Sequence, residues 1–305
     1  MRKAILPACL AIMIASISAQ SERFVLAIVR FDGRLVPFAA YNGGQWDRAW
    51  PEADEQPAGT PTLDTIASVW RRAGQEVPLV WRVMTGWNSA TAARIGGLAR
   101  VNSHCSEQLA LASDLPSHEW KETDRFGVAT DSDLQLVPIE LVDRANVLWQ
   151  TAAQLITARF SALESAQARL ERRDPVRERP TPPVEVKALY REAGSIQSPL
   201  QSLAERRYRE SVYPPGSPEC PVRTIVSGWL LPASSGRLTL TNAAVFLTDC
   251  EGVEVTDTNP LAAFKVGDRR FWIVQEYGYE REAYLIVEPT LPEIRTVLGA
   301  FGGAC

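Results

Sequence analysis

Carboxylates near the C-terminus are the side chains of this chain with the clearest capacity for chemistry. Glu276, Glu280 and Glu282 lie around one predicted turn, with Tyr277 and Tyr279 between them. Two carboxylates about 5–10 Å apart can act as the acid and the nucleophile or base of glycoside hydrolysis. The alternative is a solvated hairpin end that carries ordinary surface charges. The cluster therefore supports a glycan-directed hydrolase as the secondary hypothesis.

Aromatic side chains suggest binding rather than catalysis. The chain has nine tryptophans, and Trp46, Trp50 and Trp87 lie close to Gly, Asn and Pro residues that predict loops. Exposed aromatic rings can stack on the apolar faces of sugars or anchor a protein partner. With Tyr277 and Tyr279, these three are the candidate ligand-binding residues. The alternative is that the tryptophan rings fold inward and cover a sheet.

Histidines and nucleophile motifs give no catalytic centre. His118 is followed four residues later by Glu122, where a zinc-protease helix has its second histidine. His104 adjoins Cys105, but neighbouring side chains in a strand point to opposite faces. The sequence has no G-x-S-x-G elbow and no glycine loop of the phosphate-binding type. We therefore expect no catalytic residue of these kinds, no metal and no cofactor.

The first 19 residues predict a secretory signal peptide. Arg2 and Lys3 precede an apolar run over residues 4–15, and mostly small residues follow it up to Ala19. The run is shorter than the roughly 20 residues that span a bilayer, and no later segment is apolar enough to do so. We therefore expect an exported protein, periplasmic or extracellular, without an integral membrane span after cleavage. An uncleaved anchor is the alternative.

Four cysteines remain after such a cleavage, and an exported chain permits disulfides. A predicted hairpin centred on Ser235 places Cys220 opposite Cys250, since each is fifteen residues from the centre. Facing residues of an antiparallel pair lie within disulfide reach. Cys105 and Cys305 then pair by elimination, unless Cys305 stays free or pairs between chains.

Charge excludes one class of partner. The chain has 32 Lys and Arg against 36 Asp and Glu, and loss of Arg2 and Lys3 leaves 30 against 36, a net charge of −6. Neutralisation of phosphates needs a basic face, so we expect no nucleic-acid partner. A glycan or a cell-envelope protein is the expected partner.

The elements that must position these residues are short strands joined by turn signals. Asp32-Gly33 and Gly267-Asp268 each separate two apolar strands, which is typical of a hairpin. Helices do not alternate with strands, so a parallel sheet is not expected. The sequence predicts a mainly antiparallel β fold, propeller-like or a two-sheet sandwich, with one long amphipathic α-helix.

The helix divides the chain. Apolar residues at three-to-four spacing predict one helix over 141–174, and a Pro-rich connector follows at 175–183. Two β-rich parts, 20–140 and 184–305, flank this unit and could form one continuous domain. Segment 203–213 fits either a strand or a helix, and residues 292–300 predict a final short helix.

These patterns favour a non-enzymatic binding or envelope-associated module. The glycan-directed hydrolase is the alternative. A third hypothesis is a subunit whose long helix packs against a partner or against a second copy of the chain.

Overall fold

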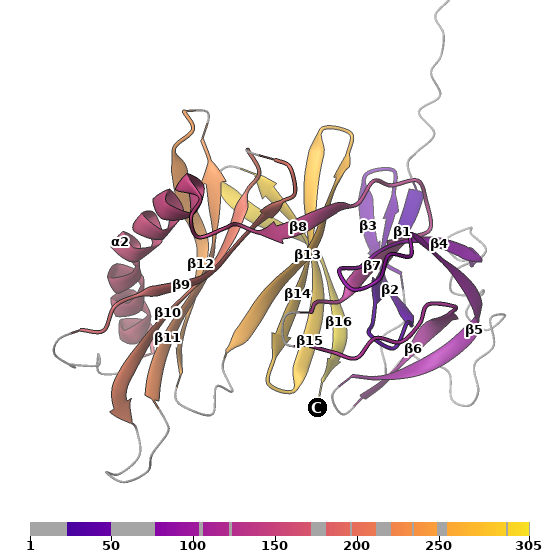
Figure 1. Ribbon diagram of the computed structural model, residues 1–305, viewed down its shortest axis with the longest axis horizontal. Helices are drawn as coiled ribbons and strands as arrows, with labels where there is room; N and C mark the ends of the chain where they lie inside the picture. Colours follow the sequence, from indigo (N-terminus) through magenta and orange to yellow (C-terminus); the bar gives the residue numbers. More distant parts are fainter. Residues whose placement is uncertain are drawn as a thin grey trace, which may run out of the picture.

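The described residues fold into two antiparallel sheets and one helix. A computed structural model describes residues 23–49, 77–103, 106–121, 124–171, 181–195, 197–211, 221–233, 235–248, 255–290 and 292–304. Over these ranges it contains sixteen strands and helix α2. The mainly antiparallel β fold with one long helix is thus confirmed. The helix and the first sheet lie at opposite ends of the molecule (Figure 1).

The first sheet has seven strands in the order β1-β7-β4-β5-β6-β2-β3. Their bounds are β1 Arg23–Val29, β2 Leu35–Asn42, β3 Gln45–Arg48, β4 Val80–Met84, β5 Ala92–Ser103, β6 Ser106–Ser113 and β7 Gly127–Thr130. β1 also pairs with β2, so the sheet closes on itself. The predicted Asp32-Gly33 turn joins these two strands, and Gly33 has a φ of +78°.

Strand β1 is buried on both faces, which explains its unbroken run of apolar residues. Val25, Ala27 and Val29 face the interior of the closed sheet, where Trp81 and Leu109 also lie. The alternate residues, from Phe24 to Ile28, pack against the second sheet. The contact of Phe24, Leu26 and Ile28 with the second sheet joins the two sheets through a shared apolar core.

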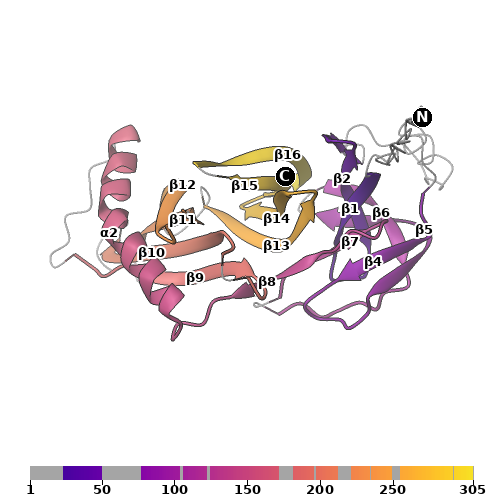
Figure 2. The same cartoon turned by 90° about the horizontal axis from the view of Figure 1, so that it is seen from above.

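The second sheet has nine strands in the order β12-β11-β10-β9-β8-β13-β14-β15-β16. Their bounds are β8 Val137–Leu141, β9 Glu185–Glu192, β10 Leu200–Ser211, β11 Pro221–Pro232, β12 Leu238–Thr248, β13 Thr256–Val266, β14 Arg269–Gly278, β15 Arg281–Thr290 and β16 Glu293–Ala304. Segment 203–213, for which the sequence fitted either a strand or a helix, lies largely in β10. In Figures 1 and 2, β8 lies between strands β9 to β12 and the seven-stranded sheet.

The nine-stranded sheet curls until its two edge strands meet. Trp229 of β11 and Trp272 of β14 touch inside the curl, with ring centroids 5.0 Å apart. At the edges, Asn242 of β12 donates to the Ile294 carbonyl at 3.3 Å and accepts from the Ile294 N–H at 3.0 Å. Asn242 has a φ of 47°, which lets its side chain reach β16. One amide side chain therefore imitates a backbone pair between the edges.

Helix α2, Val147–Leu170, covers strands β9 to β12. Its buried residues Trp149, Ala152, Ile156 and Phe160 follow the predicted three-to-four spacing. The helix begins later than the expected residue 141, because Leu141 belongs to β8 and the Asn146 side chain caps the first turn by accepting from the Leu148 N–H.

A polar cluster beneath α2 fixes it to the sheet. Glu164 accepts from Tyr208 at 2.6 Å and from Thr224 at 2.5 Å, and it also pairs with Arg206. The Tyr208 and Arg206 side chains are buried. Burial, together with the bond to Glu164, raises the pKa of Tyr208 to about 12.

Two local expectations change. The final helix expected over 292–300 is wrong, because β16 occupies this segment and pairs along its length with β15. The hairpin centred on Ser235 keeps its predicted register from Pro232↔Leu238 to Trp229↔Thr241, and a bulge then shifts it by one residue. Cys220 and Cys250 lie outside the described residues, so their disulfide stays a prediction.

Candidate ligand-binding cleft between the sheets

A cleft of about 840 Å³ opens where the two sheets and the segment after β6 meet. The first sheet contributes Arg30 and Phe31, which follow β1, and the segment after β6 contributes Trp120 and Arg125. The second sheet contributes side chains of β9, β13, β14 and β15. A volume in the range of about 300–1,000 Å³ is usual for a site that takes a small molecule.

Strand register brings the polar residues of the second sheet together. Asp257 of β13 faces Tyr277 of β14, and Tyr277 faces Glu282 of β15. Asn259 and Gln275 form the next facing pair on the same side, because side chains two residues apart share a face. The wall of the cleft therefore presents a carboxylate, a phenol and two amides.

Glu282 forms the floor of the cleft and is only 2% exposed. Its carboxylate accepts from Gln275 Nε2 at 2.5 Å, from the Tyr284 hydroxyl at 2.7 Å and from Arg30 at 3.4 Å. Arg30 comes from the other sheet, so this pair joins the two halves. The contacts leave Glu282 little capacity to bind a ligand.

Trp120 and Tyr277 form the mouth of the cleft. The Trp120 side chain is 60% exposed and that of Tyr277 is 48% exposed. Both residues line the cleft. Two large aromatic side chains exposed at one opening are therefore candidates for contact with a ligand or partner.

The segment that carries Trp120 is held at both ends. The His118 backbone N–H donates to the Phe31 carbonyl at 2.6 Å, and its ring hydrogen-bonds Asp124 at 2.8 Å. This bond holds the pKa of Asp124 below its usual value. The His118 ring also packs against Phe31 and Trp87. His118 therefore supports the segment that carries Trp120 and is not among the residues that line the cleft.

Two charged side chains of the cleft lie in unusual surroundings. Partial desolvation of its carboxylate raises the pKa of Asp257, although the residue stays exposed, and nearby Arg223 partly offsets this effect. Arg125 places its guanidinium 4.2 Å above the Tyr190 ring and donates to the Pro260 carbonyl at 3.1 Å. Its pKa is lowered, because burial disfavours the charged form.

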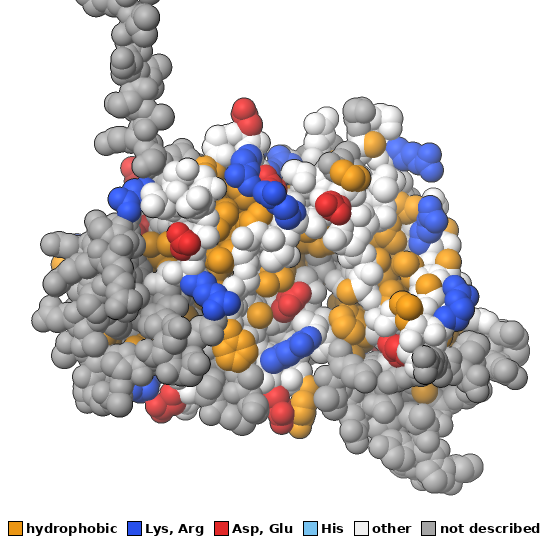
Figure 3. Space-filling view, turned by 180° about the vertical axis from the view of Figure 1, so that it is seen from behind, with side chains coloured by type: hydrophobic (Ala, Val, Ile, Leu, Met, Phe, Trp, Pro, Cys, Tyr) orange, Lys and Arg blue, Asp and Glu red, His pale blue; other side chains and the backbone are white. Residues whose placement is uncertain are grey.

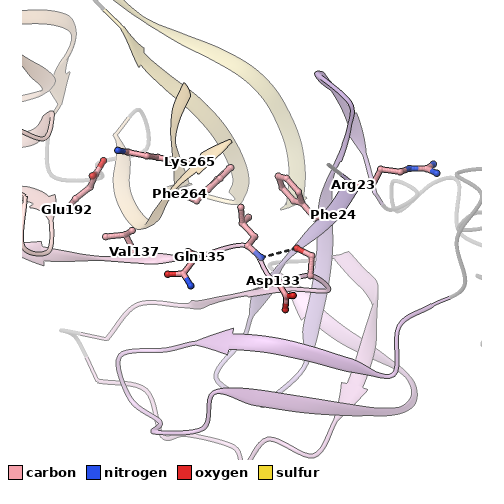
Figure 4. Close-up of a pocket in the computed structure, with 10 residues that line it drawn as sticks. Arg23, Phe24, Asp133, Gln135, Val137, Glu192, Phe264 and Lys265 are labelled. Carbon is pink, nitrogen blue, oxygen red and sulfur yellow. Dashed lines mark hydrogen bonds between the residues drawn. The ribbon is translucent and has the colours of Figure 1, made fainter. Parts of the chain in front are cut away.

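A second hollow, of about 510 Å³, lies between β1, the segment before β8, and β13 (Figure 4). Glu192 lines it, but this carboxylate accepts from Trp272 Nε1 at 2.9 Å and is 3.2 Å from Arg270. Phe24 and Phe264 in its wall are buried core residues. The hollow therefore offers no exposed ring, unlike the cleft.

The structure assigns the predicted site residues to different places. Tyr277 lines the cleft, whereas Tyr279 is exposed in the turn after β14. Trp46 is half-buried and packs on Tyr41 and Phe264 in the core, which is the inward alternative. Trp87 packs on Phe31 and His118 beside the cleft. Trp50 lies outside the described residues, as do Cys105, Cys220, Cys250 and Cys305.

The three predicted carboxylates are not a group on one face. Only Glu282 lines the cleft, since Glu276 alternates to the other side of β14 and Glu280 lies in the turn after it. The sequence did not predict Trp120, Arg125 or Asp257 as site residues. Trp120 stands among charged residues, which resembled a solvated loop, and no local pattern marked the other two.

Within the described ranges, no three His, Cys, Asp or Glu residues are grouped so as to hold a metal ion. No described helix has the length and apolar character needed to cross a membrane. The face seen in Figure 3 mixes acidic, basic and apolar side chains. No family model, curated protein or solved structure matches the chain.

Proposed function

We propose that the protein is an exported, non-enzymatic binding protein that holds a sugar-containing ligand in the cleft between its sheets. The observation that carries this proposal is the pair of exposed rings, Trp120 and Tyr277, at the mouth of the cleft. The apolar face of a sugar ring can pack on such rings, while its hydroxyls need donors and acceptors. Asn259, Gln275 and Asp257 supply these polar groups beside Tyr277.

Export to the periplasm or the cell exterior is part of this proposal. It rests on the leader-like residues 1–19 and on the four later cysteines. Cell-envelope glycans are present in those compartments and are the first candidates. A protein of the envelope that presents an apolar residue to Trp120 is the other occupant that the test must consider.

Binding to a glycan array and co-sedimentation with isolated cell-wall material test the proposal. Tyr277 and Tyr279 form a matched pair, because both are exposed, they are two residues apart, and only Tyr277 lines the cleft. We expect Trp120→Ala and Tyr277→Ala each to weaken glycan binding about tenfold or more, corresponding to about 1.4 kcal/mol. Tyr279→Ala should bind like the wild type. Absence of glycan binding by the wild type would contradict the proposal.

Hydrolysis of the bound glycan is the second candidate, and one observation favours it. Asp257 and Glu282 flank Tyr277 on one face of the sheet, and the raised pKa of Asp257 suits a proton donor. Against it, the Glu282 carboxylate is buried and already accepts three hydrogen bonds. Release of reducing ends from a bound glycan, lost in Asp257→Asn, would favour the enzyme over the binding protein.

A further inference from the structure

Arg125 is the cleft's cation without an acidic partner in the described part of the chain. Two other charged groups that line the cleft have partners of opposite charge or a hydrogen bond, since Arg30 pairs with Glu282 and the Asp124 carboxylate bonds His118. The pKa of Asp257 is raised by desolvation, and Arg223 offsets this effect only in part. The contacts of Arg125 are instead the Tyr190 ring and the Pro260 carbonyl oxygen. Neither of these groups carries a negative charge that would balance the guanidinium.

The position of Arg125 leaves donors available to a ligand. A guanidinium has five N–H donors, and the bond to Pro260 uses one of them. The stack on Tyr190 fixes the plane of the group, so its orientation does not have to be established when a ligand binds. None of the Arg125 nitrogens is among the buried polar atoms that lack a partner. The remaining donors are therefore accessible, and Arg125 lines both the cleft and a neighbouring hollow of about 250 Å³.

Partial burial of the Arg125 side chain favours an anionic partner. Removal of a charge from water is costly unless a partner of opposite sign offsets the loss. Here no side chain of the described residues provides the partner. A ligand carboxylate would provide it, and its two oxygens match the fork of a guanidinium in a bidentate pair.

We infer that the ligand carries an anionic group, of the kind found in acidic sugars, and that Arg125 binds this group. The inference rests on the proposed glycan-binding function and deepens it, since it names the chemical class of the sugar. Trp120 and Tyr277 contact the ring faces, and Arg125 selects the charged substituent.

The test uses one oligosaccharide in two charge states. Trigalacturonate carries three carboxylates, and its fully methyl-esterified form has the same backbone without charge. Isothermal titration calorimetry measures the affinity of the wild-type protein for both at low and at high salt. We expect the acid to bind about tenfold or more tightly than the ester, as for a charge-assisted bidentate pair, with a smaller difference at high salt.

Variants assign that preference to one residue. Arg125→Gln should bind acid and ester with equal affinity. Arg159→Gln removes the same charge from an exposed position on α2 and should keep the preference. Arg125→Lys keeps the charge but not the fork, and should show a reduced preference. If Arg125→Gln does not fold, a shift of the wild-type Arg125 Nε–H NMR signal on addition of trigalacturonate replaces that arm.

The outcomes separate the two proposals. Equal affinity of the wild type for acid and ester would overturn the acidic-ligand inference and leave glycan binding intact. A preference that persists in Arg125→Gln, or an NMR signal that does not move, would overturn the role of Arg125. Binding of neither form would overturn the acidic-ligand inference for this sugar class, whereas glycan binding itself is decided by the glycan array and the cell-wall co-sedimentation.

Discussion

Removal of the Glu282 carboxylate should destabilise the protein rather than only alter the cleft. Three donors lose their acceptor in Glu282→Ala: the Tyr284 hydroxyl, the Gln275 amide and the Arg30 guanidinium. The Tyr284 side chain is 1% exposed and that of Gln275 is 7% exposed, so water cannot readily replace the lost oxygen atoms. Both cleft candidates depend on this floor, since it joins strands β14 and β15 to the first sheet.

The magnitude follows from what each donor retains. Breaking a buried ion pair costs about 3–5 kcal/mol, and leaving one buried donor unsatisfied costs about 1–3 kcal/mol. These two figures overlap and are not added. Arg30 keeps a bond to the Asn102 carbonyl at 3.2 Å and a position over the Phe126 ring. We therefore expect a loss of about 3 kcal/mol in the free energy of unfolding, at the lower end of the range.

Urea unfolding followed by tryptophan fluorescence measures this change. Glu280→Gln is the control, because Glu280 lies in the exposed turn of the same hairpin and should change stability by less than about 0.5 kcal/mol. A Glu282→Ala protein within about 1 kcal/mol of the wild type, with the same dependence on urea, would refute the assignment of Glu282 to the floor of the cleft.

Three further variants test other parts of the fold by the same method. Glu164→Ala leaves buried Arg206 unpaired and should cost about 3–5 kcal/mol, with much of the loss recovered in Glu164→Ala/Arg206→Met; no recovery would contradict the pairing. Asn242→Ala should cost about 1–2 kcal/mol and Asn242→Gly less, because glycine accepts the positive φ without strain; the opposite order would contradict this. Burial raises the pKa of Asp131 to about 6, above the value in the unfolded chain, so the wild type loses stability as the pH rises from about 4 to 7. Asp131→Asn keeps an acceptor for the Val25 N–H. Its free energy of unfolding should exceed that of the wild type by nearly zero at pH 4 and by about 3 kcal/mol at pH 8. A difference between the two proteins that does not change with pH would count against the raised pKa.

Local patterns predicted the elements well where a turn or a helix period defined them. Asp32-Gly33 produces the β1–β2 hairpin, and the apolar spacing from Trp149 to Phe160 produces α2. Residues 292–300 defeat the same reasoning. Pro292 and the apolar residues after it suit a helix start, but the free edge of β15 pairs with this segment as a strand. Pairing with the preceding strand overrides this local preference.

The cleft was predicted only in part, because its walls come from segments far apart in the chain. Tyr277 and Glu282 were identified from one hairpin, whereas their partner Arg30 is 252 residues away from Glu282. The role of Arg125 depends on Tyr190 and on the Pro260 carbonyl, which no sequence spacing associates with it. Trp46 shows the converse, since a tryptophan in a glycine-rich segment lies on β3 and packs into the core.

The Asn242 bridge also bears on how the protein behaves at high concentration. An open sheet presents unpaired N–H and C=O groups at its outer strands, where another chain can add a strand and begin aggregation. In the nine-stranded sheet these outer strands, β12 and β16, face each other, and the Asn242 amide occupies the Ile294 backbone groups. The bridge therefore protects the sheet from edge-to-edge assembly, and its loss would expose two strands to aggregation while most of the core stayed folded.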